Sequence, residues 1–284
     1  MNAEQQYLEL GKRLLTEGTW IENERTGKRC LTIINADMIY DVGNKEFPML
    51  STKQCFWKSA VAEKTGYLRA YTSAKDFREL GTKTWDMNAN MTQAWLDNPL
   101  RKGTDHVGVV YGAVARDFGG IDLLEEIYEK LCKGVDDRGL ILTYWKPDEF
   151  HKGCLRPCMY SHHFSLLGDT LHLTSYQRSV DYPIGCPFNM LQCYFLLDVM
   201  AKVTGYKAGK VFHKMVNIHI YEDQLELFKE QLSRTPLTEA EGFNPKFELP
   251  EDLTYEKLLT TFVPSDCTLT GYKHLGKISF PFSE

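Results

Sequence analysis

The sequence predicts a single α+β domain built around one long, buried helix. Residues 190–204 are apolar on nearly all sides of a helix, which is typical of a helix at the centre of a core. Residues 162–167 and 169–178 resemble two strands joined by a turn at Gly168. No repeat, low-complexity stretch or linker divides the 284-residue chain, so we expect one domain over residues 1–284.

Apolar residues at helical spacing predict further helices along the chain. The expected segments are residues 7–15, 58–71, 121–131 and 221–232, with a shorter amphipathic stretch at 255–259. The central helix is expected to begin after Asn189 and to end at Gly205, because glycine is a common C-terminal cap.

Two more segments are expected to be strands, residues 31–40 and 140–145. The first leads into a turn with the sequence Asp41-Val-Gly-Asn. His219 and Tyr221 alternate along an apparent strand, so their side chains should point to the same side.

The composition is that of an ordinary soluble globular protein, with 43% hydrophobic and 25% charged residues. A net charge of -5 argues against broad electrostatic attachment to DNA or to an anionic membrane. A bound phosphate would therefore need local arginines. The start of the chain does not resemble a signal peptide, and no apolar run approaches the roughly 20 residues of a membrane span.

Eight cysteines are spread along the chain, which favours a reducing cytoplasm in which they are thiols. If a phage encodes the chain, that compartment is the cytoplasm of the host. Cys154, Cys158, His162 and His163 raise the question of a metal. No second Cys/His pair stands at a matching distance, so we expect none.

The residues that suggest chemistry fall between Cys154 and Tyr221. Cys158 follows a proline in Cys-Leu-Arg-Pro-Cys158, and it is either a buried structural thiol or a nucleophile. Arg156 and Arg178 are the cations that could favour its thiolate.

The other polar residues of this segment suit a pyrimidine nucleotide. Arg178 with Ser179 could hold a phosphate through charge-assisted hydrogen bonds. Asn189 is either a helix N-cap or a reader of the O4 and N3–H edge of uracil, whereas an aspartate would suit cytosine better. His219 and Tyr221 could bind a sugar hydroxyl.

The chain resembles thymidylate synthases and their relatives, the phage-type deoxypyrimidine hydroxymethylases. The resemblance covers nearly the whole length and is most specific in the centre. Its motifs are Asn23-Glu-Arg-Thr-Gly27, Thr84-Trp-Asp86, Val110-Tyr-Gly112, Tyr176-Gln-Arg-Ser-Val-Asp181, Gly185-Cys-Pro-Phe-Asn189 and His219-Ile-Tyr221.

This resemblance implies the family's fold, a mixed β-sheet with a long buried central helix. It also implies that the substrate is dUMP, that 5,10-methylenetetrahydrofolate is the co-substrate, and that the enzyme is a symmetric homodimer. In that dimer Arg138 would reach the phosphate in the neighbouring active site. No membrane or DNA partner is implied.

The resemblance further implies a role for individual residues. Cys158 adds to C6 of the pyrimidine, Glu63 organises proton transfers, Tyr111 lies near the C5 proton and Asn189 reads the base. The implied substrate-binding residues are Arg25, Arg138, Gln177, Arg178, Ser179, Asp181, Asn189, His219 and Tyr221. The implied folate-binding residues are Trp85, Asp181, Gly185 and Phe188.

In this chemistry, thiolate addition at C6 makes C5 nucleophilic enough to capture a one-carbon unit. Hydride transfer then gives a methyl group, whereas water addition gives a hydroxymethyl group. The outcome depends on how well the closed site excludes water.

Several departures from the family pattern fall near the folate side. Lys64-Thr65-Gly66-Tyr67 follows Glu63 where a large apolar wall is usual, and Met159 replaces a histidine. Asn88 stands in place of a second tryptophan, and the chain ends at Glu284, whose charge makes a poor lid.

These departures favour 5-hydroxymethyl-dUMP as the product. Thymidylate synthase activity, from dUMP to dTMP with dihydrofolate, is the alternative. A catalytically idle nucleotide- or RNA-binding homologue is a third possibility, because Asp136-Asp137-Arg138-Gly139 holds one arginine where the family usually has two.

Overall fold

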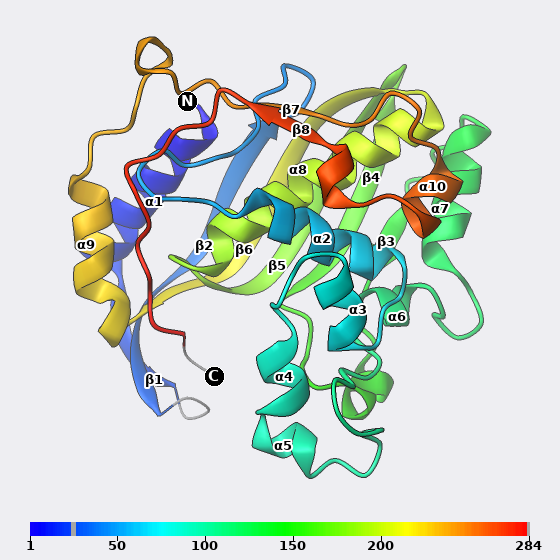
Figure 1. Ribbon diagram of the computed structural model, residues 1–284, viewed down its shortest axis with the longest axis horizontal. Coiled ribbons are helices and arrows are strands. Elements are labelled where there is room, and N and C mark those ends of the chain that lie inside the picture. Colours follow the sequence, from blue (N-terminus) through cyan, green and yellow to red (C-terminus); the bar gives the residue numbers. More distant parts are fainter. Residues whose placement is uncertain (24–26, 283–284) are drawn as a thin grey trace.

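The computed structural model describes residues 1–23 and 27–282 (Figure 1). Its main sheet has six strands in the order β1-β2-β6-β5-β4-β3. β5 and β6 are parallel, and each of the other neighbouring pairs is antiparallel. The strands are β1 (Thr19–Asn23), β2 (Lys28–Asp41), β3 (Ile141–Thr143), β4 (Met159–Leu167), β5 (Thr170–Asp181) and β6 (Lys207–Tyr221).

Helices cover one face of this sheet, and α8 crosses in front of it in Figure 1. The α-helices are α1 (Ala3–Glu17), α2 (Trp57–Leu68), α3 (Ala74–Glu79), α4 (Asp86–Asn90), α5 (Gln93–Leu96), α6 (Gly112–Ala115), α7 (Leu123–Cys132), α8 (Gly185–Thr204), α9 (Leu225–Ser233) and α10 (Tyr255–Thr260). A small second sheet pairs β7 (Lys246–Glu248) with β8 (Thr268–Thr270). The predicted α+β fold, with a mixed sheet and a buried central helix, is confirmed.

Short 3₁₀ helices complete the description. They are η1 (Pro147–Lys152), η2 (Glu222–Gln224), η3 (Glu239–Glu241) and η4 (Pro264–Asp266). In the described part of the chain, no helix is long and apolar enough to cross a membrane.

The central helix α8 begins at Gly185, earlier than the sequence suggests. Pro187 falls in its first turn, where the missing N–H costs no hydrogen bond, so the proline does not delay the start. Asn189 therefore lies inside the helix, so of its two readings the one as the helix N-cap is wrong. Gly205 ends the helix in the left-handed conformation with φ 78°, as predicted.

Other boundaries differ from the predicted ones by short stretches. The helix expected to reach residue 71 ends at Leu68, because the chain turns through Ala70 at φ 55°. The helix expected from residue 221 begins at Leu225, after η2. The predicted hairpin of β4 and β5 is confirmed, and Gly168 takes φ 64° in its turn.

The parallel pairing of β5 and β6 decides where the site can form. α8 connects these two strands, so both carboxyl ends arrive at the same edge of the sheet. In the register of this pair, Ser179 lies opposite Asn217 and Asp181 lies opposite His219. The polar residues at the ends of the two strands are thereby neighbours.

The sheet face opposite the helices carries apolar side chains without helices over them. Side chains on this face alternate with the buried core residues of β2, β5 and β6. One row across five strands consists of Ile141, His163, Thr174, Phe212 and Ile39.

Candidate active site

A cavity of about 230 Å³ lies between α2, α8 and the segment that precedes α4. It brings together five of the residues to which the family resemblance assigns a role, namely Glu63, Trp85, Tyr111, Gly185 and Asn189. Its other lining residues are Lys64, Tyr67, Thr84, Asn88, Leu155, Met159, Gln192 and Phe282.

Cys158 lies beside this cavity. It is the last loop residue before β4, which begins at Met159, and both Leu155 and Met159 line the cavity. Its backbone N–H donates to the Tyr111 hydroxyl, with 3.0 Å between nitrogen and oxygen. Its carbonyl accepts from the backbone N–H of Arg178 at 2.8 Å. Two strands and the Tyr111 turn thus fix the peptide unit that carries the thiol.

The Arg178 side chain wraps around the same loop. Its Nε donates to the carbonyl of Pro157 at 2.9 Å, and Nη2 donates to the carbonyl of Arg156 at 3.3 Å. The guanidinium also lies 5.7 Å from the centre of the Trp145 ring. The structure therefore brings a fixed positive charge to the loop of Cys158, as the sequence suggested.

Glu63 is connected to Asn189 through a residue that the sequence analysis missed. Gln192 Nε2 donates to Glu63 Oε2 at 2.6 Å, and Gln192 Oε1 accepts from Asn189 Nδ2 at 3.1 Å. Burial raises the pKa of Glu63, and hydrogen bonds from Thr84, Gln192 and Tyr67 act against this rise. Its carboxyl group is therefore suited to hold or release a proton at the cavity wall.

Gln192 could have been found from spacing alone. It stands three residues after Asn189, so the two lie on one face of a helix. A glutamine in a helix that is otherwise almost wholly apolar is the signal.

The wall next to Glu63 is aromatic. Tyr67 stacks on Tyr111 with ring centres 4.4 Å apart, and its edge meets Trp85 at 6.1 Å. Lys64 is 1% exposed, and its Nζ donates to Nε2 of the buried His162 at 3.1 Å. The sequence suggested that this segment loses an apolar wall. The structure instead has a stacked aromatic wall there, with a buried lysine behind it.

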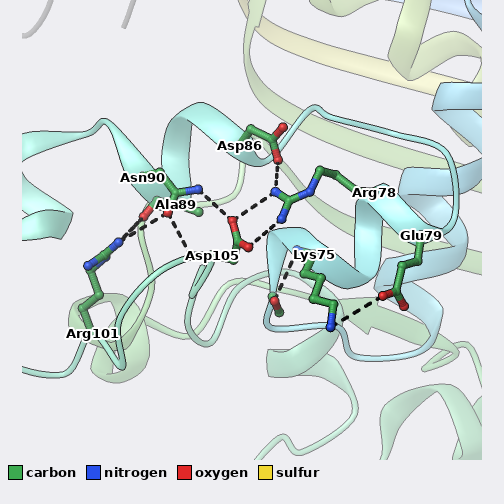
Figure 2. A network of polar contacts seen from close by, with 9 residues as sticks. Lys75, Arg78, Glu79, Asp86, Ala89, Asn90, Arg101 and Asp105 are labelled. Atoms are coloured by element: carbon green, nitrogen blue, oxygen red, sulfur yellow. Dashed lines mark hydrogen bonds and ion pairs between the residues drawn. The ribbon is translucent and has the colours of Figure 1, made fainter.

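A polar network connects α4, which begins next to Trp85, to α3 and to the loop that holds Asp105 (Figure 2). Arg78 Nη1 donates to Asp86 Oδ1 at 2.6 Å, and both of its terminal nitrogens contact the carboxylate of Asp105. Asn90 also donates to Asp105, at 2.9 Å. The network ties α3, α4 and the loop before Val107 into one unit.

A second cavity, of about 350 Å³, shares Phe282 with the first. Phe188 lines it, together with Lys53, Ile184 and other residues of α8 and the C-terminal segment. The remaining lining residues are Gln54, Cys55, Phe56, Pro187, Leu191, Lys277, Ile278, Ser279 and Phe280.

Asp181 lies at the end of β5, next to this region. Burial raises the pKa of its carboxyl group to about 6, against the effect of hydrogen bonds and of Lys53. Gln224 Nε2 donates to Asp181 Oδ2 at 2.9 Å and to the carbonyl of Pro281 at 3.0 Å. Asp181 Oδ1 is buried and finds no partner among the described residues.

His219 and Tyr221 end β6 on the same side, as predicted, with ring centres 5.3 Å apart. His219 Nδ1 bonds to Asn217 Oδ1 at 2.8 Å. The carbonyl of His219 accepts from the backbone N–H of Tyr182 at 2.8 Å, so this pair is fixed beside the end of β5.

Arg138 lines neither of the two cavities of its own chain. It is exposed on the loop before β3 at φ 63°, and its backbone N–H donates to Asp136 at 2.8 Å. Arg25 and the terminal Glu284 lie outside the described residues. Among the residues that the structure describes, no three metal-binding side chains gather into a site.

Comparison with known proteins identifies relatives over nearly the full length. The family model described as thymidylate synthase matches residues 5–284. The chain is 56% identical to a thymidylate synthase of Vibrio vulnificus, 55% to one of Vibrio cholerae and 54% to one of Shewanella piezotolerans. Each comparison covers 98% of this chain and 99% of the relative.

Proposed function

The chain belongs to the thymidylate synthase family, and from this premise we propose that it methylates C5 of dUMP to give dTMP. The observation that carries the proposal is the fixed loop of Cys158 beside a cavity that Glu63, Tyr111 and Asn189 line. The co-substrate is 5,10-methylenetetrahydrofolate, which supplies the one-carbon unit and the hydride that reduces it.

Cys158 is the nucleophile in this proposal. Its thiolate forms a bond from sulfur to C6 of the uracil ring, and the electron pair of the C5–C6 double bond moves toward O4. C5 thereby becomes nucleophilic. The guanidinium of Arg178, which is bonded to the loop carbonyls of Pro157 and Arg156, favours the thiolate over the thiol.

Glu63 and Tyr111, which line the same cavity, are the proposed groups for proton transfer. Burial raises the pKa of Glu63, so its carboxyl group holds a proton more readily than an exposed glutamate does. Tyr111 keeps its hydroxyl protonated, because burial raises its pKa well above the usual value. The proton that leaves C5 therefore passes to a group on this wall.

The carboxyl ends of β5 and β6 form the binding site for the nucleotide's sugar and phosphate. Arg178 and Ser179 bind the phosphate, and His219 with Tyr221 binds the 3′-hydroxyl. Support comes from the parallel register, which places Ser179 and Asp181 opposite Asn217 and His219. Arg25, which lies outside the described residues, is a further candidate for the phosphate.

The second cavity and the aromatic wall are the proposed folate site. Two buried polar atoms there lack partners among the described residues: Asp181 Oδ1 and Trp85 Nε1. Folate carries N–H donors and ring acceptors that would satisfy them. Phe188 and Gly185, which line the two cavities, would contact its apolar surface.

The methyl product is favoured over 5-hydroxymethyl-dUMP. The sequence departures at Lys64, Asn88 and Met159 suggest a wetter site, but Tyr67, Trp85 and Tyr111 form a packed aromatic wall on this side of the cavity. The near full-length similarity to proteins named thymidylate synthase supports the same choice.

One assay separates the two products. With dUMP and methylenetetrahydrofolate, the synthase reaction gives dTMP and an equal amount of dihydrofolate, which is followed by its absorbance. Mass spectrometry that finds hydroxymethyl-dUMP with no dihydrofolate would overturn the methyl assignment.

We also propose that two copies pair through the uncovered face of the sheet. Ile39 and Val216 are 43% and 48% exposed on it, although both are large and apolar. Arg138, which is exposed and lines neither cavity of its own chain, would then complete the site of the other copy. Mixing inactive Arg138→Ala and Cys158→Ser subunits should restore activity, because one site of each mixed dimer is intact.

The nucleophile itself is tested with 5-fluoro-dUMP and methylenetetrahydrofolate. A covalent complex should form in the parent protein and be absent in Cys158→Ser. If no complex forms although dUMP binds, the chain is a catalytically idle nucleotide-binding relative, and the proposal fails.

A further inference from the structure

A chain of hydrogen bonds runs from the core beneath the sheet to the cavity. Its distal part consists of Tyr40, His213 and Gln177, which are at most 2% exposed. The Tyr40 hydroxyl contacts His213 Nδ1 at 2.8 Å, and His213 Nε2 contacts Gln177 Oε1 at 2.8 Å. Gln177 Nε2 donates to Asn189 Oδ1 at 2.9 Å. From Asn189 the chain continues through Gln192 to Glu63, as described above.

The direction of this chain is fixed at one end by a backbone carbonyl, which can only accept, and at the other end by the ionised carboxylate of Glu63. Gln177 Nε2 also donates to the backbone carbonyl of Ser179 at 3.1 Å, which fixes the orientation of the Gln177 amide. At the other end, the carboxylate of Glu63 accepts from Gln192 Nε2. Each amide between these ends must then present oxygen to the preceding N–H.

The same constraint assigns the proton of His213. Because Gln177 Oε1 is an acceptor, His213 donates from Nε2 and accepts the Tyr40 hydroxyl proton at Nδ1. Burial lowers the pKa of His213 to about 3, so the ring is neutral at physiological pH. A neutral ring with its proton on Nε2 is the one form that satisfies both neighbours.

The fixed direction determines what Asn189 presents to the cavity. One lone pair of its oxygen and one N–H of its nitrogen are used by Gln177 and Gln192. One N–H and one lone pair remain for a ligand. The free N–H can donate to O4 of uracil, and the free lone pair can accept from its N3–H. In cytosine the same positions carry the N4–H donor and the N3 acceptor, so donor would meet donor and acceptor would meet acceptor.

We propose that Gln192 and His213 are positioning residues that hold the Asn189 amide in the orientation that selects uracil, and that Gln192 links this orientation to the Glu63 carboxylate. The inference rests on the proposed function, because it concerns how the same site chooses its nucleotide. Turning Asn189 for cytosine would place its Nδ2 against Gln177 Nε2 and its Oδ1 against Gln192 Oε1. Both contacts would be buried mismatches.

Two variants of Gln192 distinguish the effect of its hydrogen bond to Asn189 from that of its hydrogen bond to Glu63. Gln192→Met keeps the length but loses both hydrogen bonds, so the preference for dUMP over dCMP in kcat/KM should fall by about 10- to 100-fold. The acidic limb of its pH profile should also move to higher pH, because Glu63 loses a donor to its charged form.

Gln192→Glu keeps the acceptor for Asn189 Nδ2 but has no N–H for Glu63. The nucleotide preference should therefore stay within about 3-fold of the parent. The acidic limb should move further up than in Gln192→Met, because two carboxyl groups now face each other. A glutamine that only packs the core would give both variants similar losses with no such separation.

His213 is tested by a rescue pair. His213→Gln retains a donor where Nε2 lies and should keep the preference for dUMP, whereas His213→Phe should lose it by about 10-fold. In the parent protein, ¹⁵N chemical shifts of the His213 ring should show the proton on Nε2. A proton on Nδ1 would overturn the assigned direction.

The matched control is Gln231→Met. Gln231 is also a fully buried glutamine, but it bonds to Thr52 and lies outside both cavities. Its nucleotide preference and pH profile should be those of the parent.

The outcomes also separate this inference from the proposed function. Equilibrium titration of the parent protein with dUMP and dCMP comes first. If neither binds, the proposed function fails. If dUMP binds in preference and Gln192→Met and His213→Phe, both folded by circular dichroism, keep that preference, the positioning role fails while the function stands.

Discussion

The Tyr111 hydroxyl lies 3.0 Å from the backbone nitrogen of Cys158 and accepts its hydrogen bond. Tyr111 makes this contact from φ 44°, a conformation that costs a tyrosine about 1 kcal/mol or more. The surrounding aromatic stack holds it there. The strained backbone of Tyr111 is thus connected to the loop of Cys158 by a single hydrogen bond.

We predict that Tyr111→Phe lowers kcat by about 10-fold or more, because a buried peptide N–H loses its acceptor and the Cys158 loop loses its fixed position. Steady-state kinetics and the rate of the 5-fluoro-dUMP adduct measure the effect. Tyr194→Phe is the control, because the Tyr194 hydroxyl is buried without a partner among the described residues. Equal losses in the two variants would contradict the prediction.

Removal of the positive charge of Lys64 should stabilise the fold at neutral pH. Burial lowers the pKa of Lys64 to about 8, so the unfolded chain binds more protons between pH 8 and 10.5 and stability rises with pH there. At pH 7 we expect Lys64→Met to be more stable by about 1 to 3 kcal/mol, and the difference should shrink at pH 10.

Urea unfolding at the two pH values measures this difference. Lys58→Met, at an exposed position on the same helix α2, is the control and should change little at either pH. A Lys64→Met variant that is less stable than the parent at pH 7 would show that its bond to His162 outweighs the cost of burying the charge.

Arg78 is expected to position the Trp85 wall from a distance. Arg78→Met removes the contacts to Asp86 and Asp105, so the KM for methylenetetrahydrofolate should rise by about 3- to 10-fold with kcat nearly unchanged. Trp85 fluorescence should also report a more polar environment. Arg78→Lys should recover part of the loss, since one ion pair remains possible.

The comparison variant is Lys75→Met on the same helix α3. Lys75 makes a 3.8 Å pair with Glu79 on the surface, and both side chains are more than half exposed. No change in KM is expected. A loss of kcat alone in Arg78→Met would speak against a role on the folate side.

Gln224 connects Asp181 to the C-terminal segment through Pro281. Gln224→Met should raise the pKa of Asp181 further above about 6, because the carboxylate loses a donor. The acidic limb of kcat/KM for the folate should therefore move to higher pH, and KM should rise. Faster hydrogen exchange in residues 277–282 would show the released segment directly.

Much of the fold follows from local pattern. The apolar stripe of α8, the Gly168 turn and the Gly205 cap are local signals, and each is confirmed. The sequence places the start of α8 too late, because a proline often precedes a helix, whereas the first turn of α8 contains Pro187.

Only part of the site can be predicted from the sequence. Motifs suggested Glu63, Tyr111 and Asn189, and the structure brings all three to one cavity. His213 and Lys64 carry no local signal, because their partners Gln177 and His162 lie on other elements. Their roles depend on which strands become neighbours, and a single sequence does not fix that.

The layout of α8 has a consequence for engineering. Its polar positions near the cavity, Asn189 and Gln192, sit on one stripe of a helix that is otherwise packed in the core. A library restricted to these two codons could therefore retune which pyrimidine is accepted while the scaffold stays intact. Randomising the rest of the helix would mostly give proteins that do not fold, because those side chains are packed in the core.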